Sequence, residues 1–268
     1  MTKTNNLLKL IINASIEAGK AILEVYDDPD FSIELKNDQS PLTEADLASS
    51  AIINKFLKDT PYPVISEEIK NESYYERKEW ETCWIVDPLD GTKEFIKRNG
   101  EFTVNIALCK DGVPILGVIY VPVLRELYYA DAVSSKAFKV ILTGDHLLPE
   151  NLFDDSNRIF PSQTATNNLR VVGSRSHMNQ DTLDFIEEEK KNFNDVEIVS
   201  KGSSLKFCLV AEGKADVYPR FAPTMEWDTA AGHCICKAAG LKVTNVKTNR
   251  ELEYNKENLL NPYFLVSR

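Results

Sequence analysis

The stretch Trp84-Ile85-Val86-Asp87-Pro88-Leu89-Asp90-Gly91-Thr92 decides the fold prediction, because an apolar strand runs directly into two carboxylates and a turn. Pro88 lacks a backbone N–H and has a fixed φ, so we expect the strand to end there. Asp87, the Leu89 carbonyl and Asp90 would then converge on one point. Hard divalent cations such as Mg²⁺ take oxygen ligands of this kind. The stretch predicts a metal site for phosphate chemistry, although Asp, Pro and Gly also favour an ordinary acidic turn.

Composition indicates a compact chain of enzyme size. It has 268 residues, of which 43% are hydrophobic and 27% charged, as expected of one large domain or two intimate ones. The formal net charge of −10 argues against a nucleic acid polymer as partner, because such partners usually require basic stripes. The same charge repels a free anionic substrate, so an enzyme acting on phosphates would need bound cations.

The cysteines and the N-terminus bear on the compartment. Five cysteines without framework spacing favour a reduced compartment over a disulfide scaffold. In Cys234-Ile235-Cys236 the two thiols would point to different helix faces, so we expect buried thiols rather than a metal site. Lys9, Asn13 and Glu17 interrupt the apolar N-terminal residues, and no stretch is long enough to span a bilayer. We therefore expect a cytoplasmic protein without a signal peptide or transmembrane segment.

Periodicity divides the chain into two parts. Apolar residues at helical spacing predict a helix over 4–26, stopped by Asp27-Asp28-Pro29, and a second helix beginning near Thr43. Strands with intervening turns, which suggest an antiparallel sheet covered by helices, are expected at 63–65, 83–86, 103–109, 115–121 and 126–130. Helices and strands alternate later, with strands at 169–172, 196–199 and 215–218 and helices at 180–190, 203–212 and from Asp228. We expect an N-terminal α+β half (1–160) with metal-binding motifs and a C-terminal α/β half (161–268) with substrate-binding elements and Asp228.

Two further motifs accompany the opening stretch. Ser66-Glu67-Glu68 follows an apolar run, and Glu226-Trp227-Asp228-Thr229-Ala230-Ala231-Gly232 opens a helical pattern. In their order along the chain, which is 66–68, then 84–92, then 226–232, the three motifs resemble the metal-dependent, lithium-sensitive phosphatase superfamily that includes inositol monophosphatase and fructose bisphosphatase. Residues 92–108 (TKEFIKRNGEFTVNIAL) and 202–213 (GSSLKFCLVAEG) further resemble the 3′(2′),5′-bisphosphate nucleotidases of the CysQ type. The resemblance covers nearly the whole chain and fades between about residues 131 and 168.

The resemblance implies a fold and a set of metal ligands. The fold is an α+β, layered α-β-α-β-α sandwich of the sugar-phosphatase type, with the metal site between its two halves. Two Mg²⁺ ions, or three, belong to each site. The implied ligands are Glu67, Asp87 and the Leu89 carbonyl for one ion, and Asp87, Asp90 and Asp228 for another. Glu68 is the rival for the first ion, and Glu67 is favoured because the superfamily uses the first glutamate of that pair.

Asp46 and Thr92 each have two interpretations. A hydroxyl directly after Gly91 is typical of a helix cap, and Thr43-x-x-Asp46 fits the capping pattern that precedes an apolar helix. The resemblance instead implies that Asp46 and Thr92 are catalytic and hold the attacking water in line. Backbone N–H groups of Asp90, Gly91 and Thr92 are also candidates to cradle the scissile phosphate at a helix N-terminus.

The second half should choose the substrate. A nucleoside bisphosphate carries a second phosphate, and Lys206 and Arg220 are the candidate cations for that group or the ribose. Ser203 and His177 resemble family positions near the nucleoside. Taken singly, each of these four has the alternative interpretation of a surface or capping residue.

The implied activity is hydrolysis of adenosine 3′,5′-bisphosphate to AMP and phosphate, a by-product clearance linked to sulfur assimilation. 3′-Phosphoadenylyl sulfate is a second candidate substrate, and a monomer or homodimer is expected. The resemblance also allows a peripheral association with the cytoplasmic face of the inner membrane. The alternatives are an inositol or sugar phosphate phosphatase of the same superfamily and a non-catalytic nucleotide-binding regulatory module. Ser203-Ser204-Leu205-Lys206 fits the Ser-x-x-Lys pattern of penicillin-interacting enzymes, but their Ser-Asp-Asn and Lys-Thr-Gly motifs are absent.

Overall fold

The computed structural model describes residues 3–28, 33–35, 41–163, 167–173 and 179–268. Its main sheet has the strand order β3-β4-β5-β6-β7-β8. These strands are β3 (Val64–Ser66), β4 (Thr82–Asp90), β5 (Thr103–Lys110), β6 (Val113–Val121), β7 (Glu126–Asp131) and β8 (Lys136–Ile141). Every neighbouring pair is antiparallel except β3 and β4, which are parallel. The antiparallel prediction is wrong at this edge, because a crossover containing α3 (Tyr74–Arg77) replaces a hairpin there.

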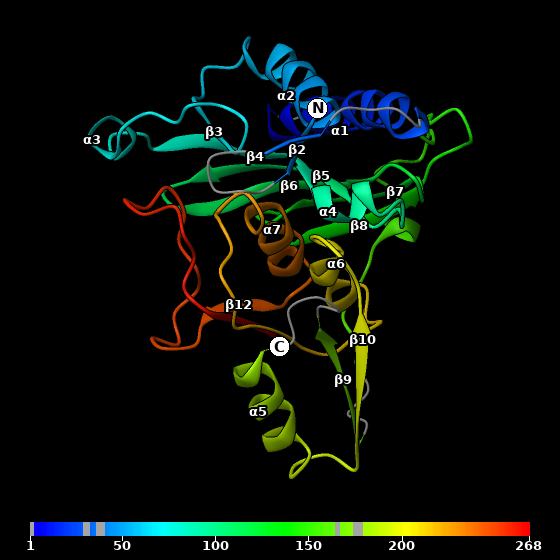
Figure 1. Ribbon diagram of the computed structural model, residues 1–268, viewed down its shortest axis with the longest axis vertical. Coiled ribbons are helices and arrows are strands. Elements are labelled where there is room, and N and C mark those ends of the chain that lie inside the picture. Colours follow the sequence, from blue (N-terminus) through cyan, green and yellow to red (C-terminus); the bar gives the residue numbers. More distant parts are fainter. Residues whose placement is uncertain (1–2, 29–32, 36–40, 164–166, 174–178) are drawn as a thin grey trace.

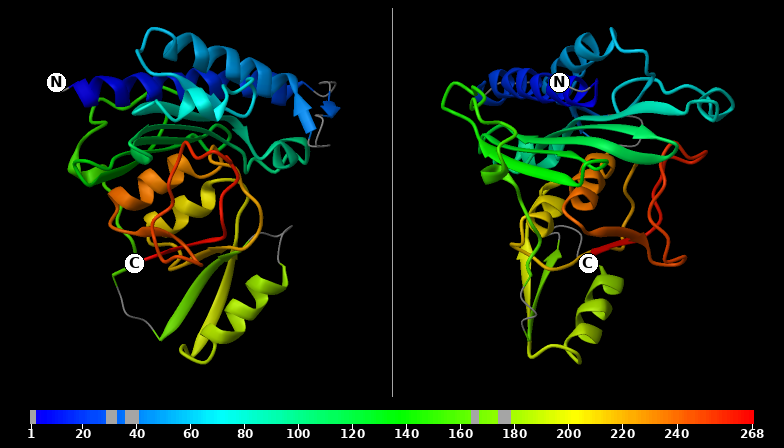
Figure 2. Two further views of the ribbon diagram at one scale, coloured as in Figure 1. Left: turned by 90° about the vertical axis from the view of Figure 1, so that its left-hand side faces the viewer. Right: turned by 180° about the vertical axis from the view of Figure 1, so that it is seen from behind.

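Helices cover both faces of the main sheet (Figures 1 and 2). On one face, α1 (Lys3–Asp27) and α2 (Glu44–Leu57) pack on each other and on the strands. On the other face lie α6 (Leu205–Ala211) and α7 (Ala230–Ala238). Because both faces are buried, the strands have nearly continuous apolar sequences.

A second layer of strands lies beyond α6 and α7. Strands β9 (Asn168–Gly173) and β10 (Asp195–Ser200) are parallel, and β11 (Tyr218–Arg220), β13 (Phe264–Ser267) and β12 (Lys242–Asn245) are antiparallel in that order. The last layer is α5 (Gln180–Glu189), as Figure 2 shows. The order of layers is therefore α-β-α-β-α, as predicted. The smaller elements are β1 (Ile33–Leu35), β2 (Pro41–Thr43), α4 (Thr92–Ile96) and the 3₁₀ helix η1 (Asp155–Asn157).

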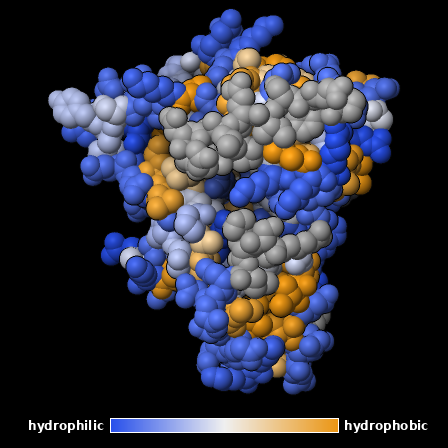
Figure 3. Space-filling model, in the orientation of Figure 1, coloured by the Kyte–Doolittle hydropathy of each residue, from blue (hydrophilic) through white to orange (hydrophobic). Residues whose placement is uncertain are grey.

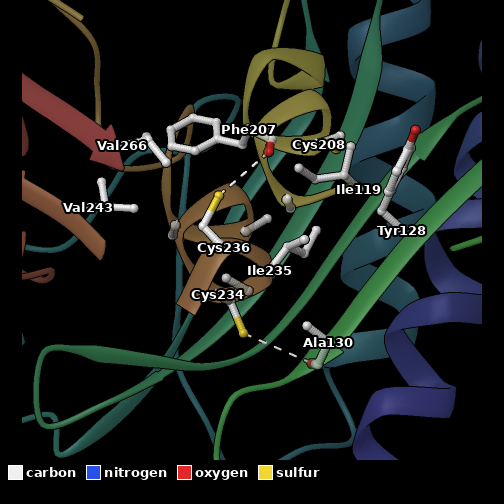
Figure 4. Close-up of a cluster of buried hydrophobic side chains, with 14 of the residues drawn as sticks. Ile119, Tyr128, Ala130, Phe207, Cys208, Cys234, Ile235, Cys236, Val243 and Val266 are labelled. Atoms are coloured by element: carbon white, nitrogen blue, oxygen red, sulfur yellow. Dashed lines mark hydrogen bonds between the residues drawn. The ribbon is translucent and has the colours of Figure 1, made fainter. Parts of the chain in front are cut away.

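The two cysteines of α7 lie in the core between this helix and its neighbours (Figure 4). Cys234 Sγ is 3.9 Å from the Ala130 carbonyl oxygen in the main sheet, whereas Cys236 Sγ is 3.5 Å from that of Phe207 in α6. The thiols therefore point in different directions, as their spacing predicts. All five cysteines are free and buried, which confirms the prediction of buried thiols.

Several local predictions differ from the structure, and the strand predicted at 215–218 lies at Tyr218–Arg220 as β11. β4 does not end at Pro88 but continues to Asp90, with a register shift between Asp87 and Asp90 that takes the proline out of the regular ladder. β8 lies in the stretch where no strand is predicted, and its buried Phe138 and Val140 extend the sheet. The proposed boundary near residue 160 remains a prediction, and α6 and α7 of the second half cover the sheet of the first.

The surface facing the reader in Figure 3 is mostly hydrophilic, and its apolar residues form separate patches. Among the described residues, none of the helices combines the length and the apolar character needed to cross a membrane.

Candidate active site

Three acidic side chains from distant parts of the chain meet at one end of the main sheet. Glu67 follows β3, Asp87 lies near the end of β4, and Asp228 precedes α7. One carboxylate oxygen of each lies within 4.8 Å of the others. At an effective dielectric constant near 20, two unit charges at this distance repel each other by about 3 kcal/mol. An arrangement of this kind calls for a cation between the carboxylates.

The pKa values of the cluster show the same requirement. Burial raises the pKa of Asp87 well above its usual range, and the neighbouring charges of Glu67, Asp90, Asp228 and Asp46 raise it further. Burial and the nearby Asp90 raise the pKa of Asp228 to about 8. A bound divalent cation would favour the charged carboxylates, and an all-oxygen donor set suits Mg²⁺. The residues present therefore fit the metal site that the sequence predicts.

The structure distinguishes the two adjacent glutamates. Glu67, and not Glu68, contributes an oxygen to the three-carboxylate cluster. Leu89 N–H donates to Asp87 Oδ1 over 3.1 Å, which orients that carboxylate at the register shift of β4. The Leu89 carbonyl oxygen lies 3.5 Å from Thr92 Oγ1, at the same end of the strand.

Asp90 is held by residues that the sequence analysis missed. The Ser204 hydroxyl lies 2.7 Å from Asp90 Oδ2 and 2.9 Å from the Asp228 carbonyl oxygen. Asn105 Nδ2 donates to Ser204 Oγ over 2.9 Å and to Asp90 Oδ2 over 3.3 Å. Ser204 therefore links the two segments that carry Asp90 and Asp228. Both residues lie within the strings that carry the family resemblance, but no spacing rule marks them.

Asp46 caps its helix and also contacts Thr92. Its Oδ2 accepts hydrogen bonds from Thr43 N–H (2.7 Å) and from Thr43 Oγ1 (2.6 Å), as a helix cap does. Its other oxygen, Oδ1, accepts from Thr92 Oγ1 over 3.2 Å. The side chain is only 1% exposed. Capping occupies one oxygen and leaves the other for Thr92, so the two interpretations are compatible.

The turn before α4 requires glycine. Gly91 has a φ of +94°, and a Cβ added there would lie 2.1 Å from Ser203 Oγ. Ser203 Oγ lies 2.8 Å from the carbonyl oxygens of both Asp90 and Glu101. Ser203 therefore fixes the turn through its hydroxyl, and its predicted place near the nucleoside stays a prediction.

A pocket of about 120 Å³ adjoins the cluster. Its lining includes Asp90, Gly91, Ser203, Lys206, Arg220 and Asp228, together with Glu94, which the sequence analysis did not single out. These residues come from β4, from α4 and the turn before it, from α6 and the segment before it, from β11 and from the segment before α7. The pocket thus brings together four of the six predicted substrate-binding residues and two of the five predicted metal ligands, Asp90 and Asp228.

The two predicted cations of the pocket differ in their surroundings. Lys206 is 7% exposed, its Nζ donates to the Ser203 carbonyl oxygen over 2.6 Å, and burial lowers its pKa to about 8. Arg220 Nη2 donates to the Pro223 carbonyl oxygen over 3.1 Å. Its buried Nε–H donor has no hydrogen-bond acceptor within the described part of the chain. His177 lies outside the described residues.

Comparisons with known proteins place the chain in one family. The inositol monophosphatase family matches residues 3–265. The 3′(2′),5′-bisphosphate nucleotidase CysQ of Salmonella typhimurium is 42% identical over 97% of this chain and 99% of its own length. The crystal structure of CysQ from Bacteroides thetaiotaomicron is 50% identical, with a TM-score of 0.87, over 98% of this chain and 97% of that one. Staphylococcal inositol monophosphatase-1, solved as a lithium chloride inhibitory complex, shares the fold at 19% identity, with a TM-score of 0.76 over 100% and 92% of the two chains.

Proposed function

The chain belongs to the inositol monophosphatase family, and we propose that it is a magnesium-dependent 3′(2′),5′-bisphosphate nucleotidase that hydrolyses adenosine 3′,5′-bisphosphate to AMP and phosphate. The observation that carries the proposal is the convergence of Glu67, Asp87 and Asp228 beside a pocket that contains Lys206 and Arg220. The nucleotidase name of its relatives supports the choice of substrate. A phosphomonoester hydrolase needs this combination, because its substrate is anionic and its nucleophile is weak.

The acidic residues have the role of metal ligands in this proposal. Two Mg²⁺ ions, or three, would be held by Glu67, Asp87, the Leu89 carbonyl, Asp90 and Asp228. Bound Mg²⁺ would neutralise the phosphoryl oxygens, stabilise the leaving oxygen and lower the pKa of the attacking water. Ser204 and Asn105 keep Asp90 oriented, since they occupy its Oδ2.

Asp46 and Thr92 have the role of orienting the water. Thr92 Oγ1 donates a hydrogen bond to Asp46 Oδ1, so the lone pairs of the hydroxyl oxygen can accept a hydrogen bond from the attacking water. The buried Asp46 carboxylate is fixed by Thr43 and cannot rotate without losing two hydrogen bonds. This rigidity holds the accepting hydroxyl in one place, which favours attack along a single line.

The remaining pocket residues recognise the substrate. Gly91 allows the scissile phosphate to approach the backbone at residues 90–92, and Ser203 holds that turn in shape. Lys206 and Arg220 line the pocket and supply positive charge for the second phosphate. We retain Thr92 and His177 as further substrate-binding candidates.

The biological setting is also part of the proposal. Hydrolysis of adenosine 3′,5′-bisphosphate, and of 3′-phosphoadenylyl sulfate as a second substrate, would serve sulfur metabolism. Five free thiols suit a reducing compartment, so we propose that the enzyme acts in the cytoplasm.

The deciding experiment measures phosphate release from adenosine 3′,5′-bisphosphate with Mg²⁺, beside inositol 1-phosphate, fructose 1,6-bisphosphate and a control without metal. We expect a strong, Mg²⁺-dependent preference for the nucleotide. If a sugar phosphate is preferred, the proposed metal-dependent hydrolysis stands and the proposed nucleotide substrate is refuted. Absence of release from every compound would favour the regulatory-module alternative.

A further inference from the structure

Two segments that lie far apart in the sequence are linked through Arg77 of α3, which donates hydrogen bonds to both. One is the segment 67–73, which begins with Glu67 and leads into α3. The other is the segment 253–257, which follows β12. Both are connected by hydrogen bonds to residues that neighbour the proposed metal ligands, and Asn255 lies at the junction.

The first loop is fixed on the Glu67 side. Ser66 N–H donates to Asn71 Oδ1 over 2.9 Å, and Asn71 Nδ2 donates back to the Ser66 carbonyl oxygen over 2.9 Å. Arg77 Nε donates to the Glu72 carbonyl oxygen over 3.0 Å. The backbone on which Glu67 stands is therefore attached, through Asn71 and Glu72, to the guanidinium group of Arg77.

Arg77 is in turn attached to Asn255. Arg77 Nη1 donates to Asn255 Oδ1 over 2.8 Å, and Asn255 Nδ2 donates to the Arg77 carbonyl oxygen over 2.7 Å. Arg77 is only 3% exposed, and its guanidinium also donates to the carbonyl oxygens of Lys256 and Glu257. A buried cation with several acceptors in fixed positions forms a rigid junction.

Asn255 also reaches the Asp228 side. Its backbone N–H donates to Glu226 Oε2 over 2.6 Å. Glu226 Oε1 accepts from Lys256 N–H (3.0 Å) and from Lys256 Nζ (2.5 Å), and the Glu226 side chain is fully buried. Glu226 stands two residues before Asp228, whose Oδ2 accepts from Met225 N–H over 2.8 Å. The fold of this segment therefore depends on the same junction.

We propose that Asn255 is a positioning residue that holds Glu67 and Asp228 together against their mutual repulsion and thereby sets the affinity of the site for Mg²⁺. The inference rests on the proposed function in one respect, namely that Mg²⁺ is the ion bound. Asn255 touches neither ligand. It acts through Arg77 on one side and through Glu226 on the other, and the residues beyond the ligands of a metal site commonly tune its affinity in this manner.

The test uses glycine substitutions at two asparagines with similar backbones. Asn255 has a φ of +59° and Asn249 has a φ of +54°, so glycine fits both positions without strain. Asn255→Gly removes the two side-chain bonds to Arg77 and keeps the backbone bond to Glu226. Asn249→Gly, at an exposed position outside the junction, is the matched control for the change in chain entropy.

Binding of Mg²⁺ alone is measured by titration calorimetry, well below the melting temperature and without substrate. We expect Asn255→Gly to bind Mg²⁺ about 10- to 100-fold more weakly than the unaltered chain, and Asn249→Gly to bind it unchanged. A lower melting temperature of Asn255→Gly with unchanged Mg²⁺ affinity would show a merely structural role and overturn the inference. If Asn255→Gly does not fold, Arg77→Lys replaces it, because it keeps the buried charge but loses the fork of contacts. If the variant binds Mg²⁺ as tightly as the unaltered chain, the positioning role of Asn255 is refuted and the proposed function is not. If the unaltered chain does not bind Mg²⁺, the proposed function is refuted as well.

Discussion

Thr92 Oγ1 donates a hydrogen bond to Asp46 Oδ1 over 3.2 Å, and this contact joins the first residue of α4 to the first turn of α2. The two residues are 46 positions apart in the sequence. A local sequence pattern explains each residue separately: Thr92 begins a helix after Gly91, and Asp46 belongs to the capping pattern of α2. Their contact gives the pair a role that neither local pattern requires.

The first prediction concerns Asp46→Asn. The amide keeps the shape but places a donor where Asp46 accepts from Thr92 or from Thr43, so the hydroxyl of Thr92 is no longer held as a donor. We expect the turnover number to fall by about 100-fold or more, because the attacking water is no longer held in line and a misplacement near 1 Å costs about that much. The free energy of unfolding should fall by only about 1 kcal/mol, the usual contribution of a cap. Steady-state kinetics and urea denaturation measure the two effects.

Glu76→Gln is the matched control for Asp46→Asn. Glu76 accepts from Ser73 N–H and Ser73 Oγ at the start of α3, which is the same capping arrangement at an exposed position. We expect it to leave turnover unchanged. Near-normal turnover in Asp46→Asn would remove Asp46 from the mechanism.

The second prediction concerns Gly91→Ala. An alanine at φ +94° costs roughly 1–2 kcal/mol of backbone energy, and its Cβ would also displace the Ser203 hydroxyl. The turn that carries Asp90 must then shift. We expect a loss of at least about 100-fold in kcat/KM, the effect of a misplacement near 1 Å.

Gly240→Ala separates the two causes of the Gly91→Ala effect. Gly240 has a φ of +91°, and an added Cβ there meets nothing within 4 Å. We expect a similar backbone cost in urea denaturation without loss of kcat/KM. Equal activity of the two alanine variants would show that the contact between Gly91 and Ser203 does not matter for the site.

Local patterns account for the parts of the fold that the sequence predicted well. The apolar period of 4–26 matches α1, and the capping pattern at Thr43 matches the start of α2. The register shift at Pro88 was not predictable, because it depends on how Asp87 and Asp90 pair with β5. β8 was missed because the chain after residue 131 was interpreted as one polar connection, although four of the six residues of β8 are apolar.

The residues of the site also fall into those that a local sequence pattern predicts and those that it does not. Its carboxylates stand in recognisable short motifs, and the resemblance assigns them roles. The residues that hold these carboxylates in position do not belong to any recognisable short motif. Arg77 and Asn255 are 178 positions apart, and nothing in the sequence around either one indicates the other. Long-range pairs of this kind follow from the packing of the layers, which periodicity does not specify.

The third prediction concerns pH and the metal-free protein. The pKa of Asp228 is about 8 in the folded chain and near 3.9 in an unfolded one. At a pH between these two values the carboxyl is protonated in the folded chain and ionised in the unfolded one, so unfolding releases a proton. Stability of the metal-free protein should therefore fall as the pH rises from about 4 to about 8. Stabilisation by Mg²⁺ should grow over the same window, because the ligands must be deprotonated. Melting temperatures at several pH values, with EDTA or with Mg²⁺, measure both trends.

Asp228→Asn is the control for this pH dependence. The variant cannot titrate at this position, so its metal-free stability should vary less with pH and Mg²⁺ should stabilise it less. A shift in melting temperature on adding Mg²⁺ that is the same at pH 5 and pH 8 would contradict the prediction.

The last prediction concerns Lys206 and the second phosphate of the substrate. Burial lowers the pKa of Lys206 to about 8, so the ammonium group loses its proton as the pH rises through that value. We expect the KM for adenosine 3′,5′-bisphosphate to rise about tenfold or more above pH 8, the usual size of a charge-assisted hydrogen bond. Lys206→Met should show the higher KM at every pH, whereas the exposed Lys214→Met should behave like the unaltered chain. Adenosine 3′-monophosphate lacks the second phosphate, so its KM should respond to neither pH nor Lys206→Met. If Lys206→Met raised the KM of both nucleotides equally, Lys206 would serve the scissile phosphate or the shape of the pocket, and the clamp for the second phosphate would be refuted.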